Sequence, residues 1–255
     1  MKLDSKQIHL WCIRDALVPD EILPSFLPLL SPEELKRYER FYFDRDKRQF
    51  LITRAALRCA LSEYFPELEP KQWQFNKNAY GRPEIAGPGY EQAIQFNLSH
   101  TTGLIVLAIT GEGELGVDVE NLSRKCEPAQ LADRFFSKVE SEALLALDEQ
   151  GQRERFFDLW TLKESYIKAC GMGLAIPLES FSFLLDSGFD IGFTSQREDD
   201  CQPWRFWQLQ VGEGHRVALA YYGAEGLIPD IVFGSYMPGA KFATEAFLPF
   251  RGKLR

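Results

Sequence analysis

The chain has 255 residues, 45% hydrophobic and 26% charged, a balance typical of a folded globular protein with one large domain or two small ones. A net charge of -8 argues against a protein that coats nucleic acid, because such a surface repels phosphates except at a local basic patch. The five scattered cysteines form no CxxC pair, which predicts neither a zinc site nor a disulfide framework. No run approaches the roughly 18 apolar residues of a spanning helix. We therefore expect a cytoplasmic protein that binds neither nucleic acid nor membrane.

The first half of the chain is predicted to begin with two helices. In "SPEELKRYERF", Ser31 and Glu34 have the spacing of a capping box, and Pro32 stands at the first helical position. The next segment, "DRDKRQFLITRAALRCALSEYF", is helical in period, basic at its start, and ends before Pro66. The segments "KQWQF", "AIQFNLS" and "GLIVLAIT" then have the pattern of strands separated by turn residues.

The second half repeats this general order. It begins with the strand "ELGVDVE" and the helix "SKVESEALLAL", continues with a longer helix in "FFDLWTLKESYIKACGMGL", and ends with the strands "SFSFLL", "RFWQLQ" and "HRVALAYY". Each half therefore has helices and antiparallel strands, which predicts an α+β fold. The boundary is expected near Gly111 to Gly113, with an N-terminal half at 1–112 and a C-terminal half at 113–255.

The strand "GVDVE" carries two carboxylates on one side. Side chains alternate along a strand, so Val117 and Val119 are expected in the core while Asp118 and Glu120 share the other face. Such a pair can bind a hard cation if a third oxygen ligand completes the site. The alternative is a half-buried strand with a solvated acidic face.

The helix in residues 156–174 places a lysine among apolar residues. On a helical wheel Lys163 falls inside the apolar arc, where a charge is costly unless an anion awaits it. Trp160, Glu164 and Lys168 recur at i, i+4 and i+8 along the margin of that arc. Glu164 is a candidate third carboxylate, and both lysines could bind a phosphate. The alternative, a surface ion pair between Glu164 and Lys168, leaves Lys163 unexplained.

In combination and order, these motifs resemble the signature of the Sfp-type 4'-phosphopantetheinyl transferases. The resemblance rests on "GVDVE", "FFSKVE" and "LWTLKESYIKACGMGL", and it extends to "SPEELKRYERFY", "YGRPEI" and "FNLSHTTG". It covers the chain from about Ser31 to Phe183. The family implies a pseudo-dimer of two similar α+β halves in one chain, with coenzyme A and the active site in the cleft between them.

The resemblance also implies a reaction and its partners. Family members transfer the phosphopantetheine arm of coenzyme A to a serine of an acyl or peptidyl carrier domain and release adenosine 3',5'-bisphosphate. By resemblance, Asp118, Glu120 and Glu164 hold Mg²⁺, or Mn²⁺, while Lys163 and Lys168 contact the phosphates or pantetheine. The expected catalytic residues are Glu164, Glu140 and Lys168. We expect a monomer.

Other basic residues match family positions that bind coenzyme A. His100 corresponds to a histidine that contacts the pyrophosphate, and Arg82 to a basic residue near the nucleotide. Arg37, Arg48 and Arg54 lie in a basic helical region that could approach the 3'-phosphate. The structural alternatives are a satisfied histidine, an exposed turn arginine and a solvated helix face.

Two further segments each have two interpretations. Glu140 is a candidate base for the carrier serine, yet Ser137 and Glu140 also have capping-box spacing. In "GMGLAIPLESF", Met172, Leu174 and Ile176 could receive an apolar carrier helix or could pack the helix end.

Two other functions are compatible with parts of the pattern. Paired carboxylates with a lysine also suit a Mg²⁺-dependent nuclease or phosphodiesterase, against which the acidic balance and the full motif set argue. A non-catalytic coenzyme A or carrier-binding module would be expected to have lost some of the five candidate site residues, which are intact: Asp118, Glu120, Lys163, Glu164 and Lys168.

Overall fold

The computed structural model describes residues 1–255 except 5, 88, 91–93, 186–188, 198–202, 225–227, 247–248 and 253–255, so Cys201 lies outside the described residues. It is a mixed α+β fold. The helices are α1 (Leu23–Phe26), α2 (Pro32–Glu39), α3 (Asp44–Tyr64), α4 (Pro128–Phe135), α5 (Lys138–Leu145) and α6 (Glu149–Ala169). The strands are β1 (Gln7–Ile13), β2 (Phe75–Lys77), β3 (Pro83–Ile85), β4 (Gln95–Thr101), β5 (Leu104–Thr110), β6 (Glu114–Asn121), β7 (Phe181–Leu185), β8 (Ile191–Ser195), β9 (Arg205–Val211), β10 (His215–Tyr222), β11 (Asp230–Ser235) and β12 (Ala243–Thr244).

Two sheets form the centre of the molecule. The larger has the order β12-β11-β1-β5-β4, and the smaller has the order β6-β10-β9. Neighbouring strands are antiparallel except β1 and β11, which pair in parallel. Residues 230–244 of the predicted second half thus join the sheet of the first half. A boundary at Gly113 does not account for this return of the chain.

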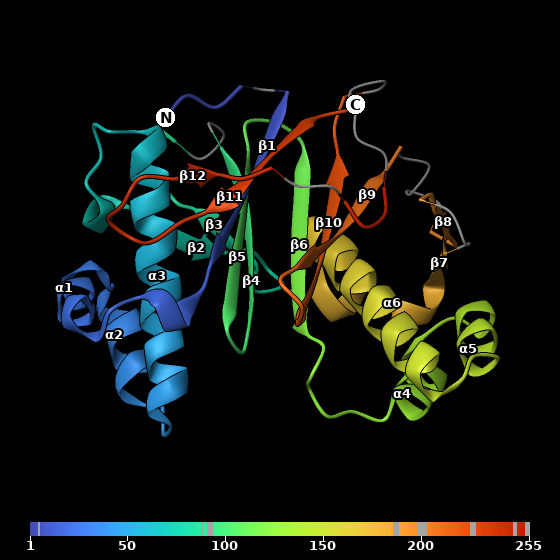
Figure 1. Ribbon diagram of the computed structural model, residues 1–255. Helices are drawn as coiled ribbons and strands as arrows, with labels where there is room; N and C mark the ends of the chain where they lie inside the picture. Colours follow the sequence, from blue (N-terminus) through green and yellow to red (C-terminus); the bar gives the residue numbers. More distant parts are fainter. Residues whose placement is uncertain are drawn as a thin grey trace.

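The two sheets pack face to face between two long helices (Figure 1). Alternation along β5 shows the layering: Val106 faces the core shared with β6, β9 and β10, whereas Ile105 and Leu107 face the core formed with α3. In the same way Ala218 and Ala220 of β10 face α6, and Val217 and Leu219 face the other sheet. The order of layers is therefore helix, sheet, sheet, helix.

The predicted helix starts are confirmed by their caps. Ser31 and Ser137 each accept a hydrogen bond from the backbone N–H of the third residue of the following helix. The carboxylates of Glu34 and Glu140 in turn accept from the backbone N–H of these serines. Helix α3 ends before Pro66, as expected. Helix α6 begins at Glu149, earlier than the apolar pattern indicated, because Asp148 caps it by accepting from Gly151 N.

Side chains join the facing edges of the two sheets. Asn97 Oδ1 of β4 accepts from Val117 N of β6 at 3.0 Å, and Ser99 Oγ accepts from Val119 N at 3.3 Å. These bonds satisfy edge N–H groups that would otherwise be buried without a partner. This junction between β4 and β6, here called the seam, places Ser99 of the first half beside Asp118 of the second.

Candidate functional site

The acidic strand β6 is placed as predicted but is more buried than a solvated face would be. Val117 and Val119 lie in the core between the sheets. Asp118 and Glu120 are only 5% and 8% exposed. Asp118 stands opposite Ala218 in the ladder, on the side that faces α6. The acidic pair therefore lies between the small sheet and the long helix.

Asp118 has one oxygen with partners and one without. Its Oδ1 accepts from Lys168 Nζ at 2.6 Å and from Ser99 Oγ at 2.9 Å. Its Oδ2 is buried, and no hydrogen bond to it is found within the described part of the chain. A buried carboxylate oxygen without a partner is costly, so it indicates a ligand that the protein itself does not supply.

The three candidate carboxylates influence one another electrostatically. Burial, aided by the charge of Asp118, raises the pKa of Glu120 to about 7, although Arg124 and Lys168 act to lower it. Burial and the charge of Asp118 likewise raise the pKa of Glu164, which Lys168 partly offsets. An added cation near these groups would relieve the repulsion.

The donor set suits a hard cation, although the side chains are not gathered around one point. All three candidates offer carboxylate oxygens, the ligands preferred by Mg²⁺ and Mn²⁺. Over the ranges that the structure describes, no three histidine, cysteine, aspartate or glutamate side chains are grouped to hold a metal ion. The fit thus rests on the donor chemistry and the unpartnered Oδ2, and the three-carboxylate site stays a prediction.

His100 lies at the end of β4, near a cluster of positive charge. Its side chain reaches solvent. Partial desolvation lowers the pKa of His100, and the charges of Lys168, Arg37 and Arg54 lower it further, while Asp118 raises it. His100 is therefore neutral near pH 7, surrounded by cations that can meet an anionic ligand.

Arg37 and Arg54 lie close to this cluster. The Arg37 guanidinium lies over the ring of Phe50 at 5.2 Å. Arg54 Nε pairs with Glu34 Oε1 at 3.1 Å, and burial lowers the pKa of Arg54 while Glu34 raises it. Both arginines remain candidates for phosphate binding.

Arg48, by contrast, binds other groups of the protein. Its guanidinium donates to the carbonyls of Asp15 and Val18 and pairs with Asp20. These contacts hold the 15–20 segment against the first turn of α3. They do not favour the 3'-phosphate contact that the resemblance implied.

Arg82 is also used within the protein. It donates to Ala169 O at 2.8 Å, and its Nη1 lies 3.3 Å from Glu114 Oε2. Its side chain is 10% exposed. The structure thus directs this guanidinium to the end of α6 rather than to a nucleotide.

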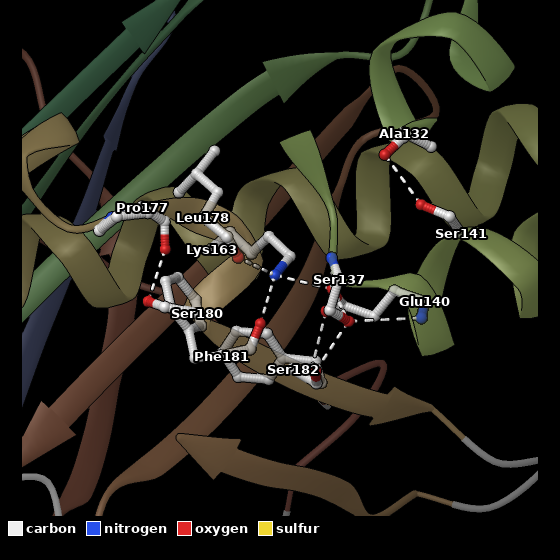
Figure 2. A network of polar contacts seen from close by, with 11 residues as sticks. Ala132, Ser137, Glu140, Ser141, Lys163, Pro177, Leu178, Ser180, Phe181 and Ser182 are labelled. Atoms are coloured by element: carbon white, nitrogen blue, oxygen red, sulfur yellow. Dashed lines mark hydrogen bonds and ion pairs between the residues drawn. The ribbon is translucent and has the colours of Figure 1, made fainter. Parts of the chain in front are cut away.

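Lys163 lies in the apolar arc of α6 as predicted, and its anion is Glu140 (Figure 2). The ammonium lies 2.8 Å from Glu140 Oε2 and donates to the carbonyls of Leu178 and Phe181, each at 2.7 Å. Burial lowers the pKa of Lys163, and Glu140 raises it. With none of its side chain exposed, Lys163 has no route to a ligand. These contacts do not favour the contact with phosphate or pantetheine that the resemblance implied.

Glu140 is equally enclosed. Its Oε2 accepts from Ser137 N and Ser137 Oγ as well as from Lys163 (Figure 2). Its Oε1 accepts from Phe183 N at 2.8 Å. The carboxylate is 1% exposed. Both of its oxygens are occupied, so the capping interpretation is confirmed and the position does not suit a base that must reach a carrier serine.

The three apolar residues predicted to receive a carrier helix differ in their solvent exposure. Ile176 is 1% exposed and belongs to the core under α6, whereas Leu174 is 75% exposed. Met172 is partly buried against the same core. Of these three candidates, Leu174 is thus the one that is exposed to a partner.

Sequence reasoning missed Ser99 as a site residue. It donates to Asp118 Oδ1 and accepts from Lys168 Nζ at 3.0 Å. Its position next to His100 in "FNLSH" could have marked it as a candidate. That it faces Asp118 depends on the packing of β4 against β6, which the sequence does not show. Ser99 thus links the candidate site to the first half of the chain.

Comparison with known proteins bears on what this site is for. Residues 114–220 match a family model described as the 4'-phosphopantetheinyl transferase superfamily, and residues 20–112 match one described as 4'-phosphopantetheinyl transferase, N-terminal. The chain is 36% identical over 175 residues to 4'-phosphopantetheinyl transferase HetI from Nostoc sp., covering 69% of this chain and 73% of that protein. The chain belongs to the 4'-phosphopantetheinyl transferase family.

Other members of the 4'-phosphopantetheinyl transferase family show similar coverage. Identity to 4'-phosphopantetheinyl transferase Sfp from Bacillus subtilis is 33% over 196 residues, which is 76% of this chain and 83% of that protein. Among solved structures, a Thermotoga maritima holo-[acyl-carrier-protein] synthase aligns with a TM-score of 0.37 at 19% identity, covering 55% of this chain and 86% of that chain. The family assignment rests on the sequence matches.

None of the helices in the described ranges is long and apolar enough to cross a membrane.

Proposed function

We propose that this chain transfers the 4'-phosphopantetheine arm of coenzyme A to a serine of an acyl or peptidyl carrier domain. The observation that carries the proposal is Asp118 at the seam between the sheets, with Lys168 and Ser99 on Oδ1 and a buried Oδ2 without a partner. Membership of the 4'-phosphopantetheinyl transferase family supports the same reaction.

The carboxylates that would hold the metal are Asp118 through Oδ2, Glu120 and Glu164. When bound, Mg²⁺ supplies positive charge to the pyrophosphate oxygens, with Mn²⁺ as an alternative. The raised pKa values of Glu120 and Glu164, to which the charge of Asp118 contributes in both cases, support binding of a cation by these groups. A cation would favour their ionised forms.

The basic groups around His100 would bind the substrate phosphates. Lys168 lies within hydrogen-bond distance of Asp118 and, with Arg37 and Arg54, contributes to the low pKa of His100. A neutral imidazole can donate to a phosphate oxygen, and the three cations offset phosphate charge. The Lys168 side chain is 28% exposed, whereas that of Lys163 is fully buried.

The transfer step forms a bond between the carrier serine oxygen and the phosphorus that bears pantetheine. The pyrophosphate bond to the nucleotide breaks, and adenosine 3',5'-bisphosphate leaves. The serine proton needs an acceptor near the metal carboxylates. Glu164 is a candidate acceptor because its side chain is only partly buried, unlike that of Glu140.

The seam between β4 and β6 supports a pseudo-dimer with the active site between its halves. Each half contributes a 21-residue helix, α3 or α6, packed on one outer face of the sheet pair. Ser99 and His100 come from the first half, and Asp118, Glu164 and Lys168 from the second. Superposing residues 44–110 on the unit formed by α6, β6, β9 and β10 tests whether the halves are similar.

The proposal is tested by incubating the purified chain with coenzyme A, Mg²⁺ and a panel of apo acyl and peptidyl carrier domains. Mass spectrometry should detect the mass of one phosphopantetheine on the carrier serine, together with release of adenosine 3',5'-bisphosphate. Carrier serine-to-alanine variants are the matched controls. If the folded chain modifies none of the carriers at saturating coenzyme A, the proposal is overturned.

A further inference from the structure

The C-terminus of α6 is closed by the other half of the molecule. Carbonyls at a helix end have no partner within the helix. Ala169 O accepts from Arg82 Nη1 and Gly171 O accepts from Asn78 Nδ2, both at 2.8 Å. Both donors belong to the single turn 78–82 that joins β2 to β3. Two groups at the end of α6 thus depend on one distant turn.

Asn78 has contacts on both sides of this junction. Its Oδ1 accepts from Tyr80 N at 2.9 Å and from Arg82 N at 3.0 Å, which fixes the shape of the turn. Its amide group donates outward to Gly171 O. One side chain therefore organises the turn and attaches it to α6.

The contact leaves little room for a side chain at Gly171. This glycine has a φ of +69°, and a Cβ there would lie 3.2 Å from both Arg82 Cδ and Asn78 Nδ2. A positive φ strains other residues as well. Gly171 both ends the helix and lets the turn approach its carbonyl.

The end of α6 is also fixed against β6. A Cβ on Gly116 would lie 2.0 Å from Ser165 O and 2.4 Å from Ala169 N, so the strand and the helix meet backbone to backbone. The residue before Ala169 is Lys168, whose ammonium lies 2.6 Å from Asp118 Oδ1. Glu164 lies one turn earlier. A small shift of the last two turns of α6 would move both side chains relative to Asp118.

We propose that Asn78 and Arg82 are positioning residues that set the place of Lys168 and Glu164 against Asp118 by closing the end of α6. An arginine at this end also opposes the negative pole of the helix. The inference rests on the proposed transfer reaction, and it replaces the nucleotide contact first expected of Arg82. It assigns a function to the junction between the halves.

Asn78→Asp and Arg82→Met test this role. Asn78→Asp keeps the oxygen that accepts from Tyr80 N and Arg82 N, but it removes the donor to Gly171 O and places negative charge at the helix end. Arg82→Met keeps the length of the side chain without its donors. Lys77→Met, at an exposed position of the same hairpin, is the matched control.

Transfer kinetics separate positioning from substrate binding. Both variants should lower kcat by about tenfold or more, with KM for coenzyme A within about twofold of the wild-type value, because the reacting groups are misplaced while the binding groups remain. Lys77→Met should match the wild type. A rise in KM for coenzyme A with unchanged kcat would make Arg82 a substrate ligand and overturn the inference, as would wild-type kinetics in both variants.

Hydrogen exchange followed by mass spectrometry tests the physical link without any turnover. Both variants should exchange the amides of residues 166–171 faster than the wild type, whereas Lys77→Met should not. Unchanged exchange in both variants would overturn the positioning role. A wild-type chain that modifies no carrier would instead overturn the proposed function, and the exchange result would still decide whether the turn fixes α6.

Discussion

The ammonium of Lys163 lies 2.8 Å from Glu140 Oε2, and neither side chain is more than 1% exposed. The pair connects the middle of α6 to the first turn of α5. Phe183 N of β7 also donates to Glu140, so three elements meet at one carboxylate. Two residues that the family resemblance assigned to substrate and chemistry thus hold these elements together.

The first prediction concerns this buried pair. Glu140→Gln should lower the free energy of unfolding by about 3–5 kcal/mol, because it leaves the Lys163 charge buried without its counter-ion. The folded variant should keep kcat within a few-fold of the wild type. Urea unfolding and transfer kinetics at saturating substrates measure the two effects.

An exposed ion pair within α5, the helix that carries Glu140, is the control for this prediction. Lys138 and Glu142 lie 3.8 Å apart with side chains 88% and 68% exposed, so Glu142→Gln should change stability by less than about 1 kcal/mol. A Glu140→Gln variant as stable as the wild type but nearly inactive would restore Glu140 as the base.

The second prediction concerns the metal carboxylates. Asp118→Asn and Glu164→Gln should each reduce kcat by about a hundredfold or more and weaken Mn²⁺ binding, since each removes a charged oxygen donor but little volume. Electron paramagnetic resonance of free Mn²⁺ reports the binding without turnover. Asp230→Asn, at an exposed position of β11, should alter neither quantity. Wild-type Mn²⁺ affinity in both site variants would refute the metal assignment.

The third prediction separates two arginines that the sequence grouped together. Arg37→Met should raise KM for coenzyme A by about tenfold, because Arg37 contributes to the positive field at His100. Arg48→Met should instead leave KM unchanged and cost about 1–3 kcal/mol of stability, since it removes donors to two carbonyls and Asp20. Steady-state kinetics and thermal unfolding distinguish these outcomes. The assignment fails if Arg48→Met raises KM and Arg37→Met does not.

Local patterns predicted much of this fold and part of its site. The alternation in "GVDVE" correctly placed Val117 and Val119 in the core and left Asp118 on the opposite face. The wheel also placed Lys163 correctly among apolar residues. Such patterns report which way a side chain points, which a short segment determines by its own geometry.

Contacts between distant segments could not be predicted in this way. Strand β1 is buried on both faces and so lacks polar alternation, and its parallel partner β11 comes from near the other end of the chain. The partner of Lys163 depends on how α5 packs on α6. The attachment of Arg82 to Ala169 O likewise depends on how the two halves meet.

The fourth prediction concerns carrier docking. Leu174→Asp should raise KM for the carrier domain while KM for coenzyme A stays nearly unchanged, because Leu174 is exposed and the substitution replaces an apolar contact surface with a charge. Ile176→Asp should destabilise the fold instead, since Ile176 belongs to the core under α6. Separate titrations of the two substrates provide the test. Equal effects of Leu174→Asp on both KM values, or no effect on the carrier, would contradict docking at this segment.

The fifth prediction concerns stability against acid. His9 is buried in β1, where Nδ1 lies 2.7 Å from the Tyr64 hydroxyl and Nε2 lies 3.3 Å from Gln7 Oε1. Burial, aided by the positive charge of the N-terminus, lowers the pKa of His9 from 6.5 to about 4. The unfolded chain therefore binds more protons than the folded one between these values.

Because the unfolded chain binds more protons, the folded state loses stability as the pH falls through this range. The contribution of neutral His9 is complete above pH 6.5 and is lost as the pH falls toward 4, by up to about 3 kcal/mol. His9→Asn keeps a polar atom near Tyr64 but cannot titrate, so its unfolding free energy should be lower at pH 7 and fall less steeply toward pH 4. Urea unfolding of both proteins at half-unit pH steps isolates the histidine, because the other titrating groups are common to both. Parallel pH profiles would show that His9 is not buried in its neutral form.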